Sequence, residues 1–493
     1  MVTAFLALAL LLPQEEAYFE LIDFPVPEHI SMEVGGILSQ KDALYLATRR
    51  GEIWKVSQPL SPQPRFEKWA EGLQEPLGLM ALDGWIYTIQ RGEISRMKDT
   101  TSDGRMDELE TVADGWHLSG NYHEYAFGPA FHPASADSAA YQSLGETLAP
   151  EKPQDFWIIL NKPFGNEPFG KAPWRGWALQ IQADGQWRGA VAGLRSPAGI
   201  GFSPQGDLFF TDNQGEWCAS GKFSVMETGE FHGHPWGIDS CKLPESAVQH
   251  PGKIPDGPSV VKAKATIPGF ALPSVWVPWD LCGRSPSGFV WDVAGNFGPY
   301  QGQVMVGDQY SAEVFRVDLE KVGGRWQGAC FPLRRGLKAG ITRVAWAQDG
   351  SLWCGMTTRG WPSLGTTTEG IQRVRWTGKT PFDLLRIRAL ADGFRLEFTA
   401  PVAPNSVTVE SFSLRSWTYH HWSNYGSAPL DEQDLTVTSA TLSADGMHVV
   451  LKVKGLRQGF VHEVEINHLN SRSGLALLHN AGWYTLNAIP AEK

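Results

Sequence analysis

The strongest constraint on the fold is a short β-type unit that recurs six times between about residues 30 and 376. Each unit has an apolar strand, a polar turn and a second apolar strand that ends in polar residues. Repeated units of this kind with Gly-rich turns are typical of a β-propeller, whose blades bury their faces against one another. The alternative is a β-sandwich with many strands. The second strands of the six units are 43–47, 85–89, 156–160, 208–210, 304–306 and 352–354.

The repeat predicts an all-β chain: a six-bladed β-propeller over residues 18–376 and an immunoglobulin-like β-sandwich over 377–493. The 53 glycines and 33 prolines argue against a helical bundle. Because the units are unevenly spaced, we expect long insertions near 133–152 and 229–268 in the third and fourth blades. After residue 376 the pattern changes to alternating strands, which is typical of a small sandwich.

The charge balance and the N-terminus bear on partners and location. With 42 basic and 53 acidic residues the net charge is −11, and we expect no nucleic-acid partner because such a chain repels phosphates. The apolar run 2–12 is too short to span a bilayer and predicts a signal peptide over residues 1–17. The alternative is an unstructured or strand-forming N-terminus. We expect no membrane span and a periplasmic or extracellular protein, for which five cysteines allow one or two disulfides, such as Cys218 with Cys241.

Polar residues follow each of the six second strands. In an inner hairpin, the residues before the first strand and after the second lie at the same end, and in a propeller that end surrounds the central channel. A ring of amides, carboxylates, guanidinium groups and the imidazole of His123 around such a pocket suits a polyol or an anionic cofactor. The alternative is that strands end in polar turns everywhere. The segments expected at this channel mouth are 48–50, 90–91, 161–162, 212–214, 308–309 and 357–359.

Five segments together resemble a known family. Residues 194–206, 211–216 and 229–235 are similar to the glucose/sorbosone dehydrogenase propellers. Residues 120–125 and 283–288 resemble more closely the bacterial membrane-bound dehydrogenase propellers. The resemblance covers most of residues 30–490, including the C-terminal sandwich.

The resemblance implies a quinoprotein-type site. The better-known relatives use a histidine as base and hold pyrroloquinoline quinone over a calcium ion. Carried over by motif, His123 is the base, Arg195 contacts cofactor or substrate, and Gln214 with the Gly215 carbonyl belongs to the quinone and calcium site. A base of near-neutral pKa is what hydroxyl oxidation requires.

The cationic groups depart from the family pattern. Where the relatives place a lysine and two arginines on the cofactor carboxylates, this chain has Tyr310, Gly340 and Thr342. The nearest candidates for contacts with the cofactor are Arg284, Arg343 and Arg359.

The segment 99–110 has the spacing of a calcium-binding loop, with oxygen ligands at positions 1, 3, 5, 7, 9 and 12 and Gly104 at position 6. Thr101 replaces the usual acid, which weakens such a site. The alternative is an acidic surface turn. The predicted ligands are Asp99, Thr101, Asp103, the Arg105 carbonyl, Asp107 and Glu110.

An aromatic cluster marks the C-terminal domain. It could stack on sugar rings or dock against the propeller, and docking is the reading we favour. Its members are Trp417, Tyr419, His420, His421, Trp422 and Tyr425.

Two functions follow from these patterns. In the first, the chain is a secreted dehydrogenase-like oxidoreductase that acts on a sugar or related alcohol at the axial pocket, with an electron acceptor as a second partner. In the second, it is a non-catalytic propeller that binds a carbohydrate or a partner and has lost the quinone.

Overall fold

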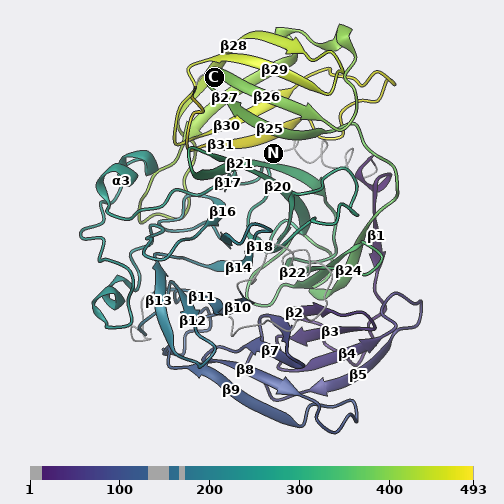
Figure 1. Ribbon diagram of the computed structural model, residues 1–493, viewed down its shortest axis with the longest axis vertical. Coiled ribbons are helices and arrows are strands. Elements are labelled where there is room, and N and C mark those ends of the chain that lie inside the picture. The colour runs from purple at the N-terminus through teal and green to yellow at the C-terminus, as the bar shows by residue number, and fades with distance from the viewer. Residues whose placement is uncertain (1–13, 132–154, 166–171, 492–493) are drawn as a thin grey trace.

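The computed structural model describes residues 14–131, 155–165 and 172–491, and in these residues the chain is almost entirely β (Figure 1). Six antiparallel four-stranded units carry the propeller. Five are separate sheets, and the strands β18 to β21 begin a larger, eleven-stranded sheet.

The first three units follow one another along the chain. Their strands, from the channel outward, are β2 (Val34–Ser39), β3 (Ala43–Thr48), β4 (Ile53–Ser57) and β5 (Arg65–Ala70); β6 (Leu79–Leu82), β7 (Trp85–Ile89), β8 (Glu93–Lys98) and β9 (Glu108–Asp114); and β10 (Ala126–Phe131), β11 (Phe156–Leu160), β12 (Trp177–Ile181) and β13 (Trp187–Ala192).

The other three units repeat this order, and the N-terminal strand completes the last of them. Their strands are β14 (Pro197–Phe202), β15 (Leu208–Asp212), β16 (Gly221–Val225) and β17 (Val275–Val277); β18 (Pro286–Trp291), β19 (Val304–Asp308), β20 (Glu313–Val322) and β21 (Arg325–Arg334); and β22 (Ile341–Trp346), β23 (Leu352–Thr357), β24 (Glu369–Trp376) and β1 (Phe19–Asp23).

The innermost strands close a ring. Contacts run from β2 to β6, β10, β14, β18 and β22 in turn, and β22 returns to β2. All six second strands predicted from the sequence lie in the second strand of their unit. The propeller prediction is therefore confirmed, and the many-stranded sandwich is not needed to explain the repeat.

Glycines let the inner strands approach one another. A Cβ at Gly78, where φ is 157°, would lie 1.8 Å from the Gly128 carbonyl oxygen of the next unit. A Cβ at Gly199 would lie 2.2 Å from the Ser287 oxygen. Since any side chain would collide with the neighbouring backbone, the repeated glycine after the Pro-x pair marks the contact between neighbouring units.

The C-terminal strands continue the eleven-stranded sheet. The last strand, β31, pairs with β21 of the propeller, and the arrangement is compatible with a β-sandwich. Its immunoglobulin type and the boundary at 376/377 stay predictions. The strands are β25 (Leu384–Leu390), β26 (Gly393–Phe398), β27 (Phe412–Thr418), β28 (Leu430–Leu442), β29 (His448–Lys454), β30 (Phe460–Ile466) and β31 (Ala481–Leu486).

One of the two predicted insertions is described. Between β16 and β17 the chain carries the 3₁₀ helix η1 (Ile238–Lys242) and the helix α3 (Val260–Thr266). The other expected insertion, near 133–152, lies outside the described residues. Two more 3₁₀ helices, η2 (Pro404–Ser406) and η3 (Val409–Ser411), lie in the C-terminal region. None of the described helices has the length and apolarity of a membrane span.

Two cysteines bear on the predicted disulfide. Cys218 and Cys241 are free thiols, so the expected disulfide between them is not formed. Burial raises the pKa of both thiols.

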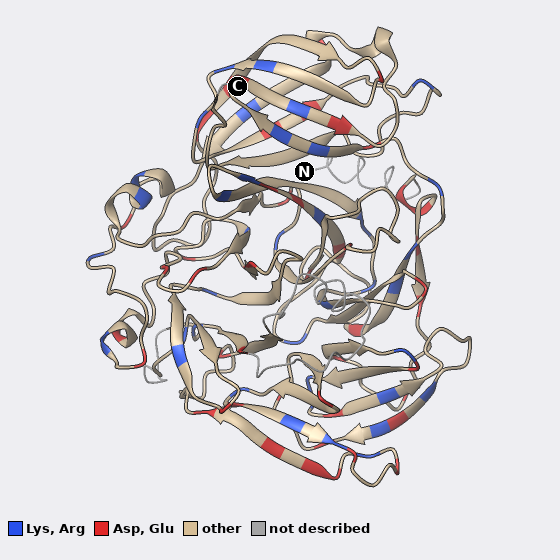
Figure 2. Cartoon of the chain, viewed as in Figure 1, with Lys and Arg blue, Asp and Glu red and all other residues tan. Residues whose placement is uncertain are grey.

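Basic and acidic residues are interspersed on the outer strands (Figure 2), as Arg65, Glu67 and Lys68 are in β5.

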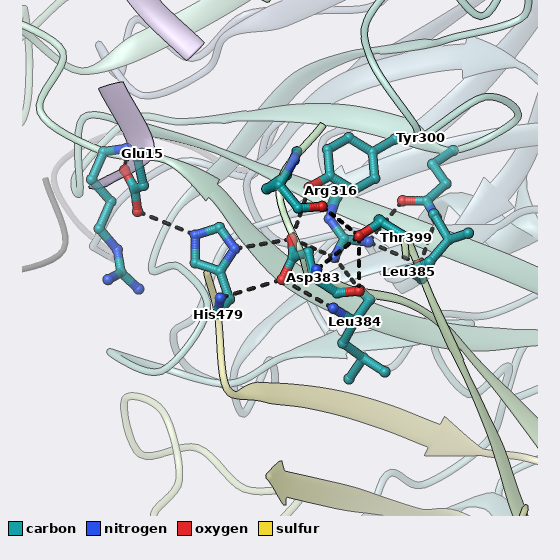
Figure 3. A network of polar contacts seen from close by, with 11 residues as sticks. Glu15, Tyr300, Arg316, Asp383, Leu384, Leu385, Thr399 and His479 are labelled. Atoms are coloured by element: carbon teal, nitrogen blue, oxygen red, sulfur yellow. Dashed lines mark hydrogen bonds and ion pairs between the residues drawn. The ribbon is translucent and has the colours of Figure 1, made fainter. Parts of the chain in front are cut away.

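A buried polar network joins the N-terminal segment, the propeller and the sandwich (Figure 3). The His479 ring nitrogens lie 3.3 Å from Glu15 and 3.2 Å from Asp383, and the Tyr300 hydroxyl donates to Asp383 at 2.7 Å. Arg316 lies 3.4 Å from Asp383 and donates to backbone carbonyls. Burial opposes the charge on His479, but the two carboxylates outweigh it and raise the His479 pKa.

This network includes part of the predicted signal peptide. Glu15 is fully buried. Its carboxylate also accepts the Arg335 N–H at 2.7 Å and lies 3.7 Å from Arg334. Glu15 is therefore packed in the fold, whereas its neighbours 14, 16 and 17 are exposed and residues 1–13 of the predicted signal lie outside the described residues.

Candidate functional site

The strand ends predicted at the channel mouth meet at one end of the ring. Arg49 donates to the Arg359 carbonyl and to Glu75 at 2.9 Å, and Glu75 also accepts from Arg91 at 2.7 Å. Arg91 in turn reaches the Asn121 carbonyl of the third unit at 3.3 Å. These contacts link the ends of four units around the channel, as the hairpin argument requires.

The most strongly charged part of the mouth is centred on Glu216. Its carboxylate is paired with Lys162 and lies 3.0 Å from Arg195 and 3.9 Å from His234. Burial alone would raise the Glu216 pKa, but these three groups hold it well below its ordinary value. The Glu216 side chain stays 26% exposed, so an ionised carboxylate flanked by two cations is open to a ligand.

His123 lies beside this cluster at the start of the third unit. Its Nδ1 is 3.2 Å from the Lys162 carbonyl oxygen, and its ring packs against Phe164 with centroids 5.3 Å apart. Burial, with added repulsion from the Arg195 and Lys162 charges, lowers the His123 pKa to about 4. The imidazole is therefore neutral at pH 7 and can accept a proton.

Gly215 makes room for Arg195. A Cβ at Gly215 would lie 1.8 Å from the Arg195 Nε, so only glycine lets the guanidinium reach Glu216. Asp212, which is fully buried, fixes the backbone before it by accepting the N–H groups of Arg195 at 3.0 Å and Ser196 at 2.7 Å. Of the three residues expected to be catalytic, the structure thus brings His123 and Arg195 to the same cluster.

Gln214 and Gly215 face a loop of the C-terminal region. The Gln214 amide donates to the Ala219 carbonyl at 3.0 Å, and Gly426 packs so closely that an added Cβ would lie 2.7 Å from Gln214. The Gly215 carbonyl accepts the Gly426 N–H at 3.0 Å. Both groups assigned to the quinone and calcium site are therefore engaged with protein partners.

The three cationic candidates are also engaged. Arg284 pairs with Asp280 and stacks on Tyr310, whose ring centroid is 4.2 Å from the guanidinium carbon. Arg359 lies 2.8 Å from Glu33. As they stand, these groups do not fit a tricarboxylate quinone, which needs free cations.

Arg343 lies inside the channel instead of at its mouth. It donates to the carbonyls of Leu77 and Ala198, each at 2.8 Å, and stacks on Phe127 at 4.6 Å. It lines a cavity of about 140 Å³ formed by the six innermost strands. Burial, together with the charge of Arg49, lowers the Arg343 pKa to about 9.

The predicted calcium loop connects β8 and β9. Asp99 accepts the Gly104 N–H at 2.9 Å, Asp103 accepts the Arg105 N–H at 2.9 Å, and Asp107 accepts the Thr101 N–H at 3.0 Å. Glu110 lies opposite Arg96 in the strand pair and accepts its Nε–H at 2.7 Å.

Strand pairing therefore directs Glu110 to Arg96, and the carboxylates bond to their own loop. Hydrogen bonds from Thr100, above all the one from its hydroxyl, lower the pKa of Asp107 to about 2. Within the described ranges, no group of three or more His, Cys, Asp or Glu side chains is placed to hold a metal ion. Calcium binding by this loop stays a prediction.

The sequence predicts Lys162 at the channel mouth. It gives no role to Lys162 itself or to Glu216 and His234. Glu216 had a local signal, since it follows the polar strand end 212–214. The aromatic cluster contacts the propeller, as the docking interpretation predicts: the His421 Nε2 lies 3.0 Å from the Gly233 carbonyl oxygen. Tyr425 is the exception, because its ring is 61% exposed beside Arg195.

No protein-family model matches the sequence, and no curated protein matches it. Solved structures with a similar fold include the PQQ-bound aldose sugar dehydrogenase of Streptomyces coelicolor, with 16% identity, TM-score 0.47, and coverage of 73% of this chain and 99% of that one. The soluble aldose sugar dehydrogenase of Escherichia coli has 13% identity and TM-score 0.46, over 72% of this chain and 99% of that one. The PQQ domain of pyranose dehydrogenase from Coprinopsis cinerea has 12% identity and TM-score 0.46, over 72% and 95%. Likenesses at this level carry no inference about function.

Proposed function

We propose that the chain is a sugar-dehydrogenase-like propeller of the periplasm or the extracellular space that binds a sugar or a related alcohol at the channel mouth. The observation that carries this proposal is the partly exposed, ionised Glu216 between Lys162 and Arg195. A carboxylate accepts from two hydroxyl groups, and the flanking cations, whose side chains are nearly buried, keep it ionised and fixed in place, which is how a polar group in a pocket orients a polyol.

His123 favours an oxidoreductase over a simple binding protein. Its neutral imidazole lies next to the carbonyl of Lys162 and can accept the proton of a bound hydroxyl. A folded-state pKa of about 4 makes this base available through the neutral range but weak. Oxidation of the carbon that carries the hydroxyl also requires an electron acceptor. The residues assigned to a quinone are paired with other protein groups, so they do not supply a site for that acceptor.

Dye-linked oxidation over a panel of sugars and alditols, with and without added quinone and calcium, tests the proposal beside calorimetric binding. His123→Asn should lower turnover by about 10²-fold or more and change affinity little, because a base acts mainly in the transition state. Glu216→Gln should weaken binding. Binding without turnover in the wild-type protein would identify a non-catalytic carbohydrate-binding propeller, and the absence of both would reject the proposal.

A further inference from the structure

The exposed ring at the channel mouth comes from outside the propeller. Tyr425 lies in the loop between β27 and β28, and its side chain is among the most exposed large apolar groups of the described chain, at 61%. The guanidinium carbon of Arg195 lies 5.2 Å from the ring centroid. Arg195 thus holds the ring at the charged cluster and leaves most of it open to solvent.

Backbone contacts fix the loop in this place. The Trp217 N–H donates to the Trp422 carbonyl at 2.8 Å, and the Ser427 N–H donates to the Ala219 carbonyl at 2.9 Å. Glu216 and Tyr425 themselves form an antiparallel bridge. Because these contacts use main-chain atoms, removal of the Tyr425 side chain leaves the loop anchored.

Aromatic rings flank the charged cluster on both sides. Contacts run from Phe164 to Lys162, whose Nζ lies 5.7 Å from the ring centroid, then to Glu216, Arg195 and Tyr425. Phe164 is 54% exposed. Exposed rings beside paired charges suit a ligand that has both an apolar face and a polar edge.

We propose that Tyr425 is a specificity-determining residue for cyclic sugars. A pyranose ring presents C–H groups on one face and hydroxyls at its edge, so it can stack on Tyr425 while the Glu216 carboxylate, held by Lys162 and Arg195, accepts from the hydroxyls. An acyclic alditol has hydroxyls of the same kind but no flat apolar face. This inference rests on the proposed function and makes the C-terminal region a part of the sugar site.

Calorimetric titration of the full chain with D-glucose, methyl glucoside and sorbitol tests the inference. Tyr425→Ala should weaken binding of the two pyranoses by about five- to tenfold, the worth of one aromatic contact, and that of sorbitol by less than about twofold. Tyr425→Phe keeps the ring and should restore pyranose affinity. Leu109→Ala, which removes an apolar side chain that is 51% exposed from β9, is the matched control.

Unchanged pyranose affinity in Tyr425→Ala, or an equal loss for sorbitol, would overturn the inference. If Glu216→Gln weakens binding while Tyr425→Ala does not, the proposed function stands without the stacking role. If the wild-type protein binds none of the three compounds, the proposed function fails and the inference falls with it.

Discussion

Arg343 shows how a single side chain can bind several blades together. Its guanidinium donates to Leu77, Ala198 and Thr342, which belong to or adjoin three different innermost strands. A carbonyl inside a propeller channel has few other donors in reach, so each of these bonds satisfies a group that is costly to leave unpaired. The side chain expected to hold a cofactor therefore stabilises the ring.

Arg343→Met should destabilise the protein by about 2 kcal/mol, since the methionine fills part of the space but donates nothing to the carbonyls. Equilibrium denaturation measures the change. Arg359→Met, which removes an arginine paired with Glu33 at the mouth, is the matched control and should cost less. An unchanged denaturation midpoint for Arg343→Met would contradict this role.

At the scale of elements, the N-terminal segment stabilises both the last unit of the propeller and the buried network around His479. The strand β1 supplies the outer edge of the last unit through its pairing with β24, and Glu15 just before it is buried against His479. Loss of one member of a buried ionic network leaves its partners charged and unpaired, at a cost of about 3–5 kcal/mol.

A chain that begins at residue 18 should therefore melt at a lower temperature than a chain that begins at residue 14, although both retain β1. Glu15→Gln in the full chain should lower the melting temperature in the same direction. Scanning calorimetry measures all three. Equal melting temperatures for the two shortened chains would show that Glu15 is dispensable.

The loop between β8 and β9 gives a second prediction at this scale. If the loop 99–110 binds calcium, chelation should lower the melting temperature by a few degrees, because a ligand that binds only the folded state stabilises it. Asp103→Ala should abolish this sensitivity. A melting curve that EDTA leaves unchanged would support the acidic surface turn.

For the whole molecule, buried histidines set the response to acid. Burial is the main reason that four histidines have a pKa of about 4 in the folded chain. They are His123, His234, His421 and His462. Between pH 6.5 and 4 the unfolded chain binds protons at these histidines and the folded chain does not. The free energy of unfolding therefore decreases as the pH is lowered. Groups whose pKa is raised act in the opposite direction: burial raises the pKa of Glu313 to about 7 and raises those of Asp292 and Asp308. Of these, Glu313 titrates nearest to neutral pH, and its effect is to be subtracted from that of the four histidines.

The melting temperature should therefore fall markedly from pH 6.5 to pH 4, and His462→Gln should flatten that fall. His462 lies in the sandwich strand β30, away from the channel mouth, so the effect is separate from any change at the sugar site. His468→Asn, at an exposed histidine, should leave the slope as in the wild type. A slope that His462→Gln does not change would assign the acid response to other groups.

The sequence allowed the propeller to be predicted because its evidence is local and repeated. Strand, turn and polar end recur within a few residues, and these ends place His123 and Arg195 at the mouth. The pairing of Glu216 with Lys162 and the approach of Tyr425 to Arg195 are different. They join segments up to about 230 positions apart, and no local pattern records such contacts.

Local spacing also carries no information about which partners the neighbouring structure gives to a side chain. The loop 99–110 has the spacing of a calcium loop, but the register of β8 with β9 sets Glu110 against Arg96. Gln214 has the motif position of a cofactor contact, but Gly426 from the C-terminal region covers it. In both cases the partner of the side chain is distant in sequence or lies across a strand pair, so the motif alone does not give it.

The two ends of the chain bear on how the protein is made. β1 completes the sheet of β24, and β31 extends the sheet that begins with β18. β1 leaves the ribosome more than 300 residues before its partner β24, so the first blades form an open ring until the last unit is synthesised. Strand edges on that nascent ring are open to mispairing until β24 joins β1.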